Sequence, residues 1–182
     1  MTATTWTFDL SHSSVSFSVR HLMIAKVRGQ FAVWGGSLEI DDADITKSKI
    51  DVTIDATTIA TQDEKRDAHL RSADFFDVET YPKLTFVSTR IEKLADDELA
   101  VHGDLTIHGV TKPVKLAVEL NGQAQDPWGG TRAGFSAKTT INRKDFGLNW
   151  NAALEAGGVL VGEKVEIALE IQAIKAAAAK AA

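Results

Sequence analysis

Apolar residues recur at every second position through most of the chain, and this alternation constrains the fold more than any other feature. The clearest run extends from Val159 to Ile171, where Val165, Ile167 and Leu169 share one face, and Lys164, Glu166 and Glu170 lie on the other. A period of two places the apolar side chains on one face of a β-strand. Because a lone hairpin is at best marginally stable in water, several such strands must cover one another's apolar faces. The sequence therefore predicts a sheet protein.

The number and spacing of these runs favour a closed barrel. The other runs span residues 6–8, 15–21, 27–40, 50–54, 84–91, 99–107, 114–120 and 133–141, which gives about eight or nine strands. The links are mostly short, so neighbouring strands should be antiparallel. A sandwich and an up-and-down barrel both fit this pattern. In the run 27–40 the apolar parity changes, which we interpret as a bend at Gly35–Gly36 in one long strand. Long bent strands favour an all-β, eight-stranded antiparallel up-and-down β-barrel.

One helical insertion interrupts the strand pattern, between the fourth and fifth strand signals. Thr61 and Glu64 match a capping box, and a charged helix follows as far as Arg71. This helix either caps one end of the barrel or is an ordinary solvated surface helix. The tail 176–182 is rich in alanine but too short to hold a helix, so we expect it to fray. Residues 1–175 are expected to form a single barrel domain.

Composition excludes several classes of function. The formal net charge of −5 argues against a nucleic acid as the partner. The absence of cysteine excludes disulfides, zinc–thiolate sites and thiol catalysis. No run approaches the roughly 20 apolar residues of a membrane-spanning helix. The first ten residues lack a basic region and a continuous apolar run, so we find no signal peptide and expect a cytoplasmic protein.

The histidines give little support for a metal site. His102 and His108 are six residues apart on one predicted strand and so about 20 Å apart. The other three are scattered and lack metal-ligand spacing, so no metal is expected. His21 extends the inward face of the strand 15–21 and is our candidate for a polar ligand contact at the barrel rim. A hydrogen-bonded core histidine is the alternative interpretation.

No catalytic or cofactor motif is present, so no catalytic residue and no cofactor are predicted. Arg28, Arg90, Arg132 and Arg143 are interpreted as surface charges. In the hairpin around Gly109, parity places Asp104, Thr106 and His108 on the outer face, with Leu105 and Ile107 facing inward.

The candidate binding residues are apolar. By parity, Phe17, Phe31, Phe86 and Phe135 lie on the inner faces of different strands, and Val19 lies beside Phe17. Such residues fill a solid core or, in a wider barrel, line an apolar tunnel.

The chain also resembles a known family, the YceI-like proteins, which are lipocalin-like barrels associated with polyisoprenoid binding. The resemblance runs nearly from end to end. It rests on Phe8–Asp9, His12–Ser13, Phe17–Leu22, Val27–Phe31, Arg66–Asp67, His69–Ser72, Asp74–Asp77, Tyr81–Pro82, Thr85–Phe86, Gly103–Pro113 and Ile141–Gly147.

This resemblance implies an eight-stranded barrel with an apolar lumen for a long isoprenoid lipid, such as a polyprenyl phosphate or an isoprenoid quinone. It also implies a homodimer, and many relatives are periplasmic. We therefore expect a non-enzymatic protein that sequesters or transports such a lipid, with transient membrane contact. The candidate ligand-binding residues are Phe17, Val19, His21, Phe31, Phe86 and Phe135. The alternatives are an enzyme acting on an apolar small molecule and a solid-cored, stress-related protein without a ligand.

Overall fold

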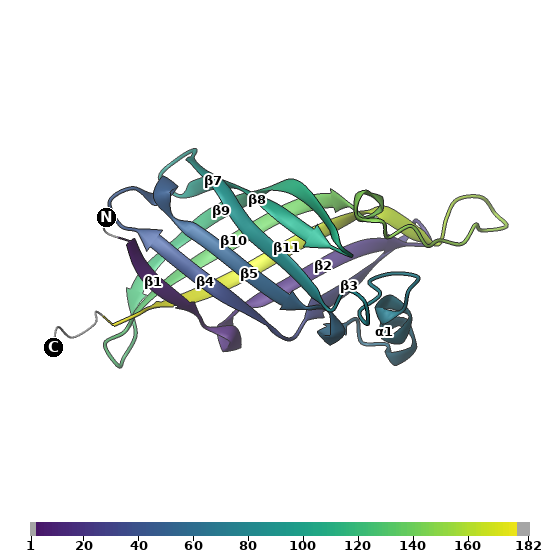
Figure 1. The fold of residues 1–182 in the computed structure, drawn as a ribbon, viewed down its shortest axis with the longest axis horizontal. Helices are drawn as coiled ribbons and strands as arrows, with labels where there is room; N and C mark the ends of the chain where they lie inside the picture. The colour runs from purple at the N-terminus through teal and green to yellow at the C-terminus, as the bar shows by residue number, and fades with distance from the viewer. Residues whose placement is uncertain (1–2, 178–182) are drawn as a thin grey trace.

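The computed structural model describes residues 3–177, and almost all of its regular structure is β-sheet (Figure 1). The strands are β1 (Ala3–Phe8), β2 (Ser14–His21), β3 (Ala25–Phe31), β4 (Trp34–Asp41), β5 (Lys49–Asp55), β6 (Ile59–Ala60), β7 (Lys83–Lys93), β8 (Glu98–Ile107), β9 (Val110–Gln125), β10 (Thr131–Asn142) and β11 (Val161–Lys175). The helix α1 (Glu64–Arg71) and four 3₁₀ turns complete the fold: η1 (Leu10–His12), η2 (Ile45–Lys47), η3 (Ala56–Thr58) and η4 (Arg143–Phe146).

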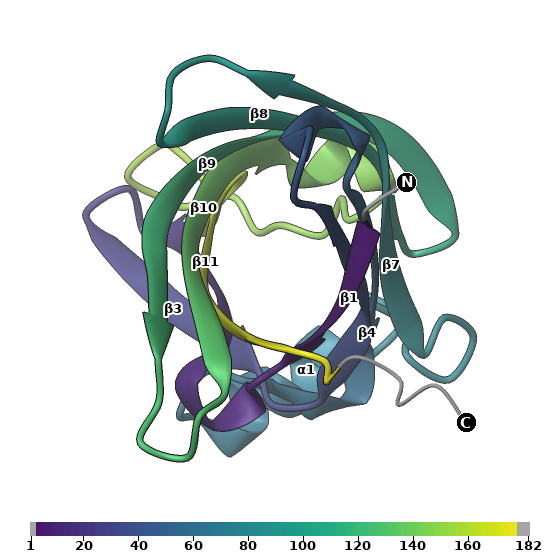
Figure 2. The ribbon, with the colours of Figure 1, turned by 90° about the vertical axis from the view of Figure 1, so that its left-hand side faces the viewer.

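The strands close into a barrel. Hydrogen bonds join them in the order β1-β4-β5-β7-β8-β9-β10-β11, and β11 pairs with β1 to complete the ring of eight. Every pairing between these strands is antiparallel. Figure 2 shows this ring from the end at which the chain termini lie. The structure confirms the predicted eight-stranded antiparallel barrel, with its helix between the fourth and fifth strand signals.

Three of the barrel's strands are interrupted, and this lengthens the barrel along its axis. The C-terminal part of β11 pairs with β1, whereas residues 161–170 pair with β2, so β1 and β2 form one long strand broken by η1. The strands β3 and β4 are likewise separated by two residues, and β6 pairs with β3 just as β5 pairs with β4. At the β2–β3–β6 end, no strand pairing joins β6 to β7 among residues 3–177.

The break in the strand 25–41 lies at Ala32–Val33, and not at Gly35–Gly36 as the parity change suggested. Val33 is 55% exposed, while Phe31 and Trp34 on either side of the break are buried. The interior parity therefore changes before the glycine pair. Gly36 has a different role: its φ is +150°, and a Cβ there would collide with the carbonyl oxygen of Asp51 on β5. The glycine lets these two strands approach closely.

The hairpin of β8 and β9 has the predicted faces, with one exception. Leu105 and Ile107 are buried, and Asp104 is exposed. His108 does not continue the outer face of the strand. It lies in the turn after β8 with a φ of +54°, its ring 4.9 Å from that of Tyr81 and its Nδ1 3.3 Å from the carbonyl oxygen of Phe146. The strand ends at Ile107, as the run 99–107 predicted, so His108 belongs to the turn and strand parity does not give its direction.

The helix begins two residues later than a capping box at Thr61 would require. Asp63 is the N-cap, and its carboxylate accepts a hydrogen bond of 2.9 Å from the backbone N–H of Arg66. Thr61 is buried and donates its hydroxyl to Asp67 instead, while the Arg66 guanidinium donates to the Thr61 hydroxyl and carbonyl. These bonds attach the helix to the barrel wall next to β6.

Different elements lie at the two ends of the barrel. At the end with the termini, Trp6, Leu38, Ile40, Ala133 and Ala173 form a buried cluster, and Trp6 is 1% exposed. At the opposite end lie α1, η4 and the segment 147–160 (Figure 1). In residues 3–177, no helix is long and apolar enough to cross a lipid bilayer. Residues 178–182 of the alanine-rich tail lie outside the described residues, so its predicted fraying is not addressed.

Candidate functional site: an apolar cavity inside the barrel

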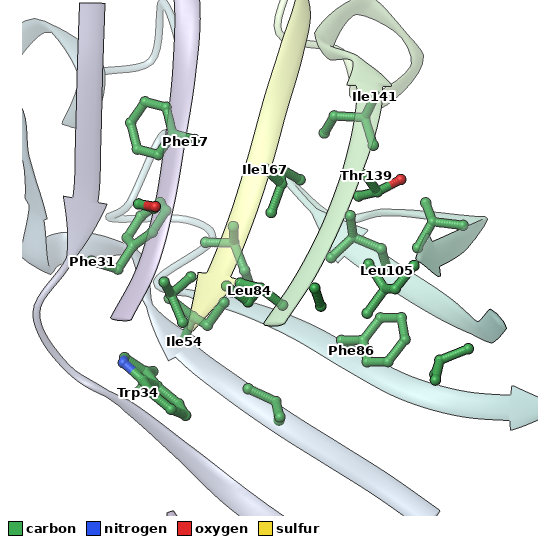
Figure 3. A pocket seen from close by; sticks show the side chains of 18 of the residues that line it. Phe17, Phe31, Trp34, Ile54, Leu84, Phe86, Leu105, Thr139, Ile141 and Ile167 are labelled. Atoms are coloured by element: carbon green, nitrogen blue, oxygen red, sulfur yellow. The ribbon is translucent and has the colours of Figure 1, made fainter. Parts of the chain in front are cut away.

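The interior of the barrel is hollow. A cavity of about 260 Å³ lies inside the barrel, and side chains from nearly every strand line it (Figure 3). The lining is dominated by Val, Ile, Leu and Phe, and its polar exceptions are Ser16, Ser48, Thr139 and Arg143. An eight-stranded barrel is just wide enough either to be filled by its side chains or to hold one small ligand. This barrel is not filled, which argues against a solid core.

Five of the six predicted ligand-binding residues lie in the cavity wall. These are Phe17, Val19, Phe31, Phe86 and Phe135. The rings of Phe17 and Phe31 are 5.7 Å apart, and Phe76 makes an edge contact with Phe31 at 6.0 Å. The strand parity therefore located these side chains correctly. Their role in binding a ligand stays a prediction.

His21 does not lie in the wall of this cavity. It has the parity of Phe17 and Val19, but it is the last residue of β2, and its partner across the sheet is Val161 at the start of β11. Val161 is among the lining residues, and His21 is not. The cavity ends before the strand does, so the predicted contact at the rim lies beyond the enclosed space.

Arg143 was interpreted as a surface charge, but the structure shows that it is buried in the cavity wall. The residue directly follows β10 in the chain and is 3% exposed. The guanidinium donates hydrogen bonds to four backbone carbonyls, those of Leu148, Trp150, Gly162 and Val161, at 2.7, 2.8, 2.8 and 3.3 Å. These bonds fix the irregular segment 147–160 against the start of β11. Nothing in the strand alternation indicates this role, because Arg143 stands just after the strand.

The charge of Arg143 is unusual in its surroundings. Burial lowers the pKa of the Arg143 guanidinium. The electrostatic attraction of the nearby Glu163 carboxylate acts in the opposite direction. Glu163 itself forms an ion pair with Lys144 at 2.7 Å. Among the described residues that line the cavity, Arg143 is the one charged side chain. The guanidinium is directed to backbone carbonyls, so Arg143 contributes mainly its aliphatic stem to the cavity surface.

The helix α1 and the turn after it cap the same end of the cavity. Leu70, Phe75 and Phe76 from this segment line the cavity. The His69 ring packs edge-on against Phe75 and Trp150, with centroids 5.1 and 4.6 Å away, and its Nε2 lies 2.7 Å from a carboxylate oxygen of Asp74. Of the two interpretations from the sequence, the cap is correct. The aromatic contacts join α1 to the segment that Arg143 holds.

Arg132 is not a free surface charge either. At the end with the termini, its guanidinium forms ion pairs with Asp9, at 2.5 Å, and with Asp126, at 2.9 Å. His12 Nδ1 lies 2.8 Å from Asp9, and the hydroxyl of Ser11 donates to Asp9 at 2.7 Å. The hydrogen bonds from Ser11, His12 and Arg132 hold the pKa of Asp9 well below its usual range. This network attaches the β9–β10 loop to η1.

Comparison with known proteins decides the family. The model of the YceI-like domain matches residues 6–173. The chain belongs to the YceI-like family. A UPF0312 protein of Staphylococcus aureus is 41% identical over 164 residues, covering 90% of this chain and 93% of the relative.

Solved structures support the same assignment. The crystal structure of BcnA from Burkholderia cenocepacia aligns with a TM-score of 0.78 and 25% identity, covering 91% of this chain and 98% of BcnA. A domain from Saccharophagus degradans, described as a polyisoprenoid binding domain implicated in plant cell wall breakdown, aligns with a TM-score of 0.70 and 16% identity. That alignment covers 94% of this chain and 98% of the domain. At this identity the second likeness concerns the fold.

Proposed function

We propose that this YceI-like protein binds a long isoprenoid lipid inside the barrel and carries it without chemical change. The observation that carries the proposal is the cavity inside the barrel, with a hydrocarbon wall and one charged residue, Arg143, near one end. Ligand pockets in proteins are mostly apolar with a few polar groups that fix the ligand's orientation. The description of the Saccharophagus domain as polyisoprenoid binding agrees with this proposal.

The dimensions of the wall suggest the length of the lipid. On β11 the lining residues run from Val161 to Ile171, ten residue steps. Ten steps correspond to about 33 Å of strand. With a strand tilt of roughly 40°, the axial length is about 25 Å. An extended isoprene unit adds four bonds and advances roughly 5 Å. In length alone, the wall matches about five extended units, and a longer chain has to fold back in the cavity or protrude from it.

The position of Arg143 suggests an orientation for the lipid. We propose that the polar head lies at the end with Arg143 and that the prenyl tail points toward the Trp6 cluster. A phosphate would supply the opposite charge that this guanidinium lacks among its hydrogen-bond partners. A quinone carbonyl could only accept a hydrogen bond there. The polyprenyl phosphate is therefore the preferred ligand of the two.

The energetics suit a carrier. Burial of a prenyl tail contributes about 0.8 kcal/mol per methylene, or roughly 20 kcal/mol gross for five isoprene units. A bilayer gives the tail a similar environment, so only the difference between cavity and membrane determines the direction of transfer. That difference is small when both are apolar, and exchange is then reversible. For the enzyme alternative, the described lining offers no second ionisable group to act with Arg143.

The experiment is extraction and uptake. Purified protein is analysed by native mass spectrometry and by mass spectrometry of an organic extract, and lipid-free protein is titrated with polyprenyl phosphates of increasing length. Trp34 lies in the wall, so its fluorescence should change when the cavity fills. We expect one lipid per chain and an affinity that stops rising at about five to eight units. Protein that copurifies with no lipid and takes up none of the series would refute the proposal.

A further inference from the structure

The tip of the β2–β3 hairpin exposes three large apolar side chains in succession. Leu22, Met23 and Ile24 are 37%, 57% and 81% exposed. They lie between His21, the end of β2, and Ala25, the start of β3, at the end of the barrel opposite the termini (Figure 1). Single exposed apolar residues are ordinary, but three adjacent ones on a projecting turn mark a contact surface.

The backbone of this tip is poorly suited to the residues that occupy it. Leu22 and Met23 have φ values of +54° and +64°, and the Ile24 N–H donates to the carbonyl of His21 at 3.2 Å. Two central residues at positive φ are typical of a type I′ turn, for which Asn-Gly is the favoured pair. Bulky side chains are disfavoured in this region. Bulky side chains thus occupy strained backbone conformations at the tip. Such strain often marks a functional contact.

The charge around the tip is positive, although the whole chain has a net charge of −5. No acidic residue stands between Asp9 and Glu39, and Arg20, Lys26 and Arg28 flank the tip on β2 and β3. Lys26 pairs with Glu166 of β11 at 2.8 Å. At the other end of the barrel, acidic residues crowd the loops after β4 and β7: Asp42, Asp44, Asp96 and Asp97. Acidic residues also lie at the hairpin end of the barrel, among them Glu64, Asp67 and Glu163. The positive charge is therefore local to the hairpin, where it favours contact with an anionic surface.

We propose that the tip Leu22–Ile24 inserts into the interface of an anionic lipid bilayer and docks the barrel there. Apolar side chains that enter the headgroup region, together with nearby Lys and Arg, are the two elements of interfacial membrane binding. A bilayer is favoured over a protein partner because the patch consists of three consecutive residues on a hairpin turn with basic residues beside it. The inference rests on the proposed function in one respect, namely that docking serves to exchange lipid with the bilayer.

The tip is connected to the end of the cavity that holds Arg143. The N–H of Leu22 donates to the carbonyl of Leu160 at 2.9 Å, and the next residue, Val161, has its carbonyl bonded to the Arg143 guanidinium. A displacement of the tip at the membrane would therefore act directly on the segment 147–160, which helps to close that end. Docking here would place the proposed head-group end of the cavity next to the lipid headgroups.

The test uses the full chain and vesicles of phosphatidylcholine with about 30% phosphatidylglycerol in a flotation assay. The variant Leu22→Asn/Met23→Gly/Ile24→Thr replaces the apolar tip by residues that suit the turn and should fold at least as well as the wild type. We expect it to bind vesicles at least roughly tenfold more weakly, because three apolar side chains no longer enter the interface. Binding of the wild type should also fall at about 0.5 M salt.

The matched control is Leu94→Asn/Trp128→Ser, which removes two exposed apolar residues, 63% and 84% exposed, from loops at the opposite end. It should bind vesicles as the wild type does. Loss of binding in this control alone would overturn the proposal, as would vesicle binding that the tip variant leaves unchanged. If the tip variant instead splits a homodimer in gel filtration and keeps its vesicle binding, the surface serves a second copy. A wild type that docks but takes up no polyprenyl phosphate from detergent would refute only the carrier function.

Discussion

The ring of Phe17 lies over Gly29, its direct partner across β2 and β3, in the space that a side chain at residue 29 would occupy. A Cβ at Gly29 would overlap Cζ and Cε1 of Phe17. The ring of Phe86 likewise covers a glycine, Gly103 on β8, although the direct partner of Gly103 on β7 is Ser88. Each phenylalanine thus lies along the barrel wall rather than across the lumen. The glycines help to keep the cavity open.

Gly29→Ala should therefore force Phe17 toward the lumen. Overpacking of this kind typically costs about 1–3 kcal/mol. We expect a lower free energy of unfolding in urea and weaker uptake of polyprenyl phosphate. The control is Gly35→Ala, since a Cβ there has no atom within 4 Å and should change neither quantity much. Equal behaviour of the two variants would show that the contact between Phe17 and Gly29 does not control the cavity.

Ala137→Phe should fill the cavity from the wall formed by β10. Ala137 lines the lumen in the middle of β10, between its partners Val118 and Leu169, which also line it. Added apolar volume in an empty cavity should leave the melting temperature similar or raise it. Lipid uptake should fall at least roughly tenfold, because burial of about two methylenes is already worth this factor. The neighbouring Lys138→Phe, on the outer face, should bind lipid normally. Similar uptake by both variants would contradict a binding site in the lumen.

Most of the fold and much of the cavity wall followed from the alternation of apolar residues. Period-two runs determine which side chains face inward, so Phe17, Phe31, Phe86 and Phe135 were placed correctly. The same rule does not indicate where a strand breaks or where a cavity ends. For this reason the bend was assigned to the glycine pair rather than to Ala32–Val33.

The surroundings of Arg143, Arg132 and His21 could not be predicted from the strand pattern. Arg143 follows β10, and its partners are backbone carbonyls, which leave no signature in side-chain patterns. Arg132 pairs with Asp9, 123 residues away in the chain, and no local rule reveals such a pair. Strand parity predicts whether the side chain of His21 points inward. It does not predict how far along the barrel axis the residue lies from the cavity, which depends on where the neighbouring strands end.

Arg143→Gln should abolish a preference for polyprenyl phosphate over the polyprenol of the same length. Both Arg143→Gln and Arg143→Lys lose the fork of hydrogen bonds to the carbonyls, which should destabilise each by about 1–3 kcal/mol. Only the lysine variant keeps a positive charge. The ratio of the two affinities, measured by Trp fluorescence, should stay high in the lysine variant and fall about tenfold or more in the glutamine variant. Equal ratios in all three proteins would exclude the proposed head-group contact.

Asp9→Asn should weaken the end of the barrel that carries the termini, and the effect should depend on pH. The pKa of Asp9 is lowered in the folded state by its hydrogen bonds to Ser11, His12 and Arg132. A carboxylate with a lowered folded pKa stabilises the protein above its unfolded pKa of about 4 and loses this contribution as the pH falls toward its folded value. We expect the variant to lose about 1–2 kcal/mol at pH 7, a typical loss for a hydrogen-bonded charge. The deficit in urea denaturation should narrow below about pH 4.

The control for this pH dependence is Asp96→Asn, because the side chain of Asp96 is fully exposed in its pair with Lys93. Exposed ion pairs contribute little to stability, so this variant should unfold as the wild type does at both pH values. A deficit of Asp9→Asn that is the same at pH 7 and in acid would show that the loss comes from changed packing at η1. A deficit that narrows in acid, together with an unaffected Asp96→Asn, would assign it to the charged network that joins Asp9, His12 and Arg132.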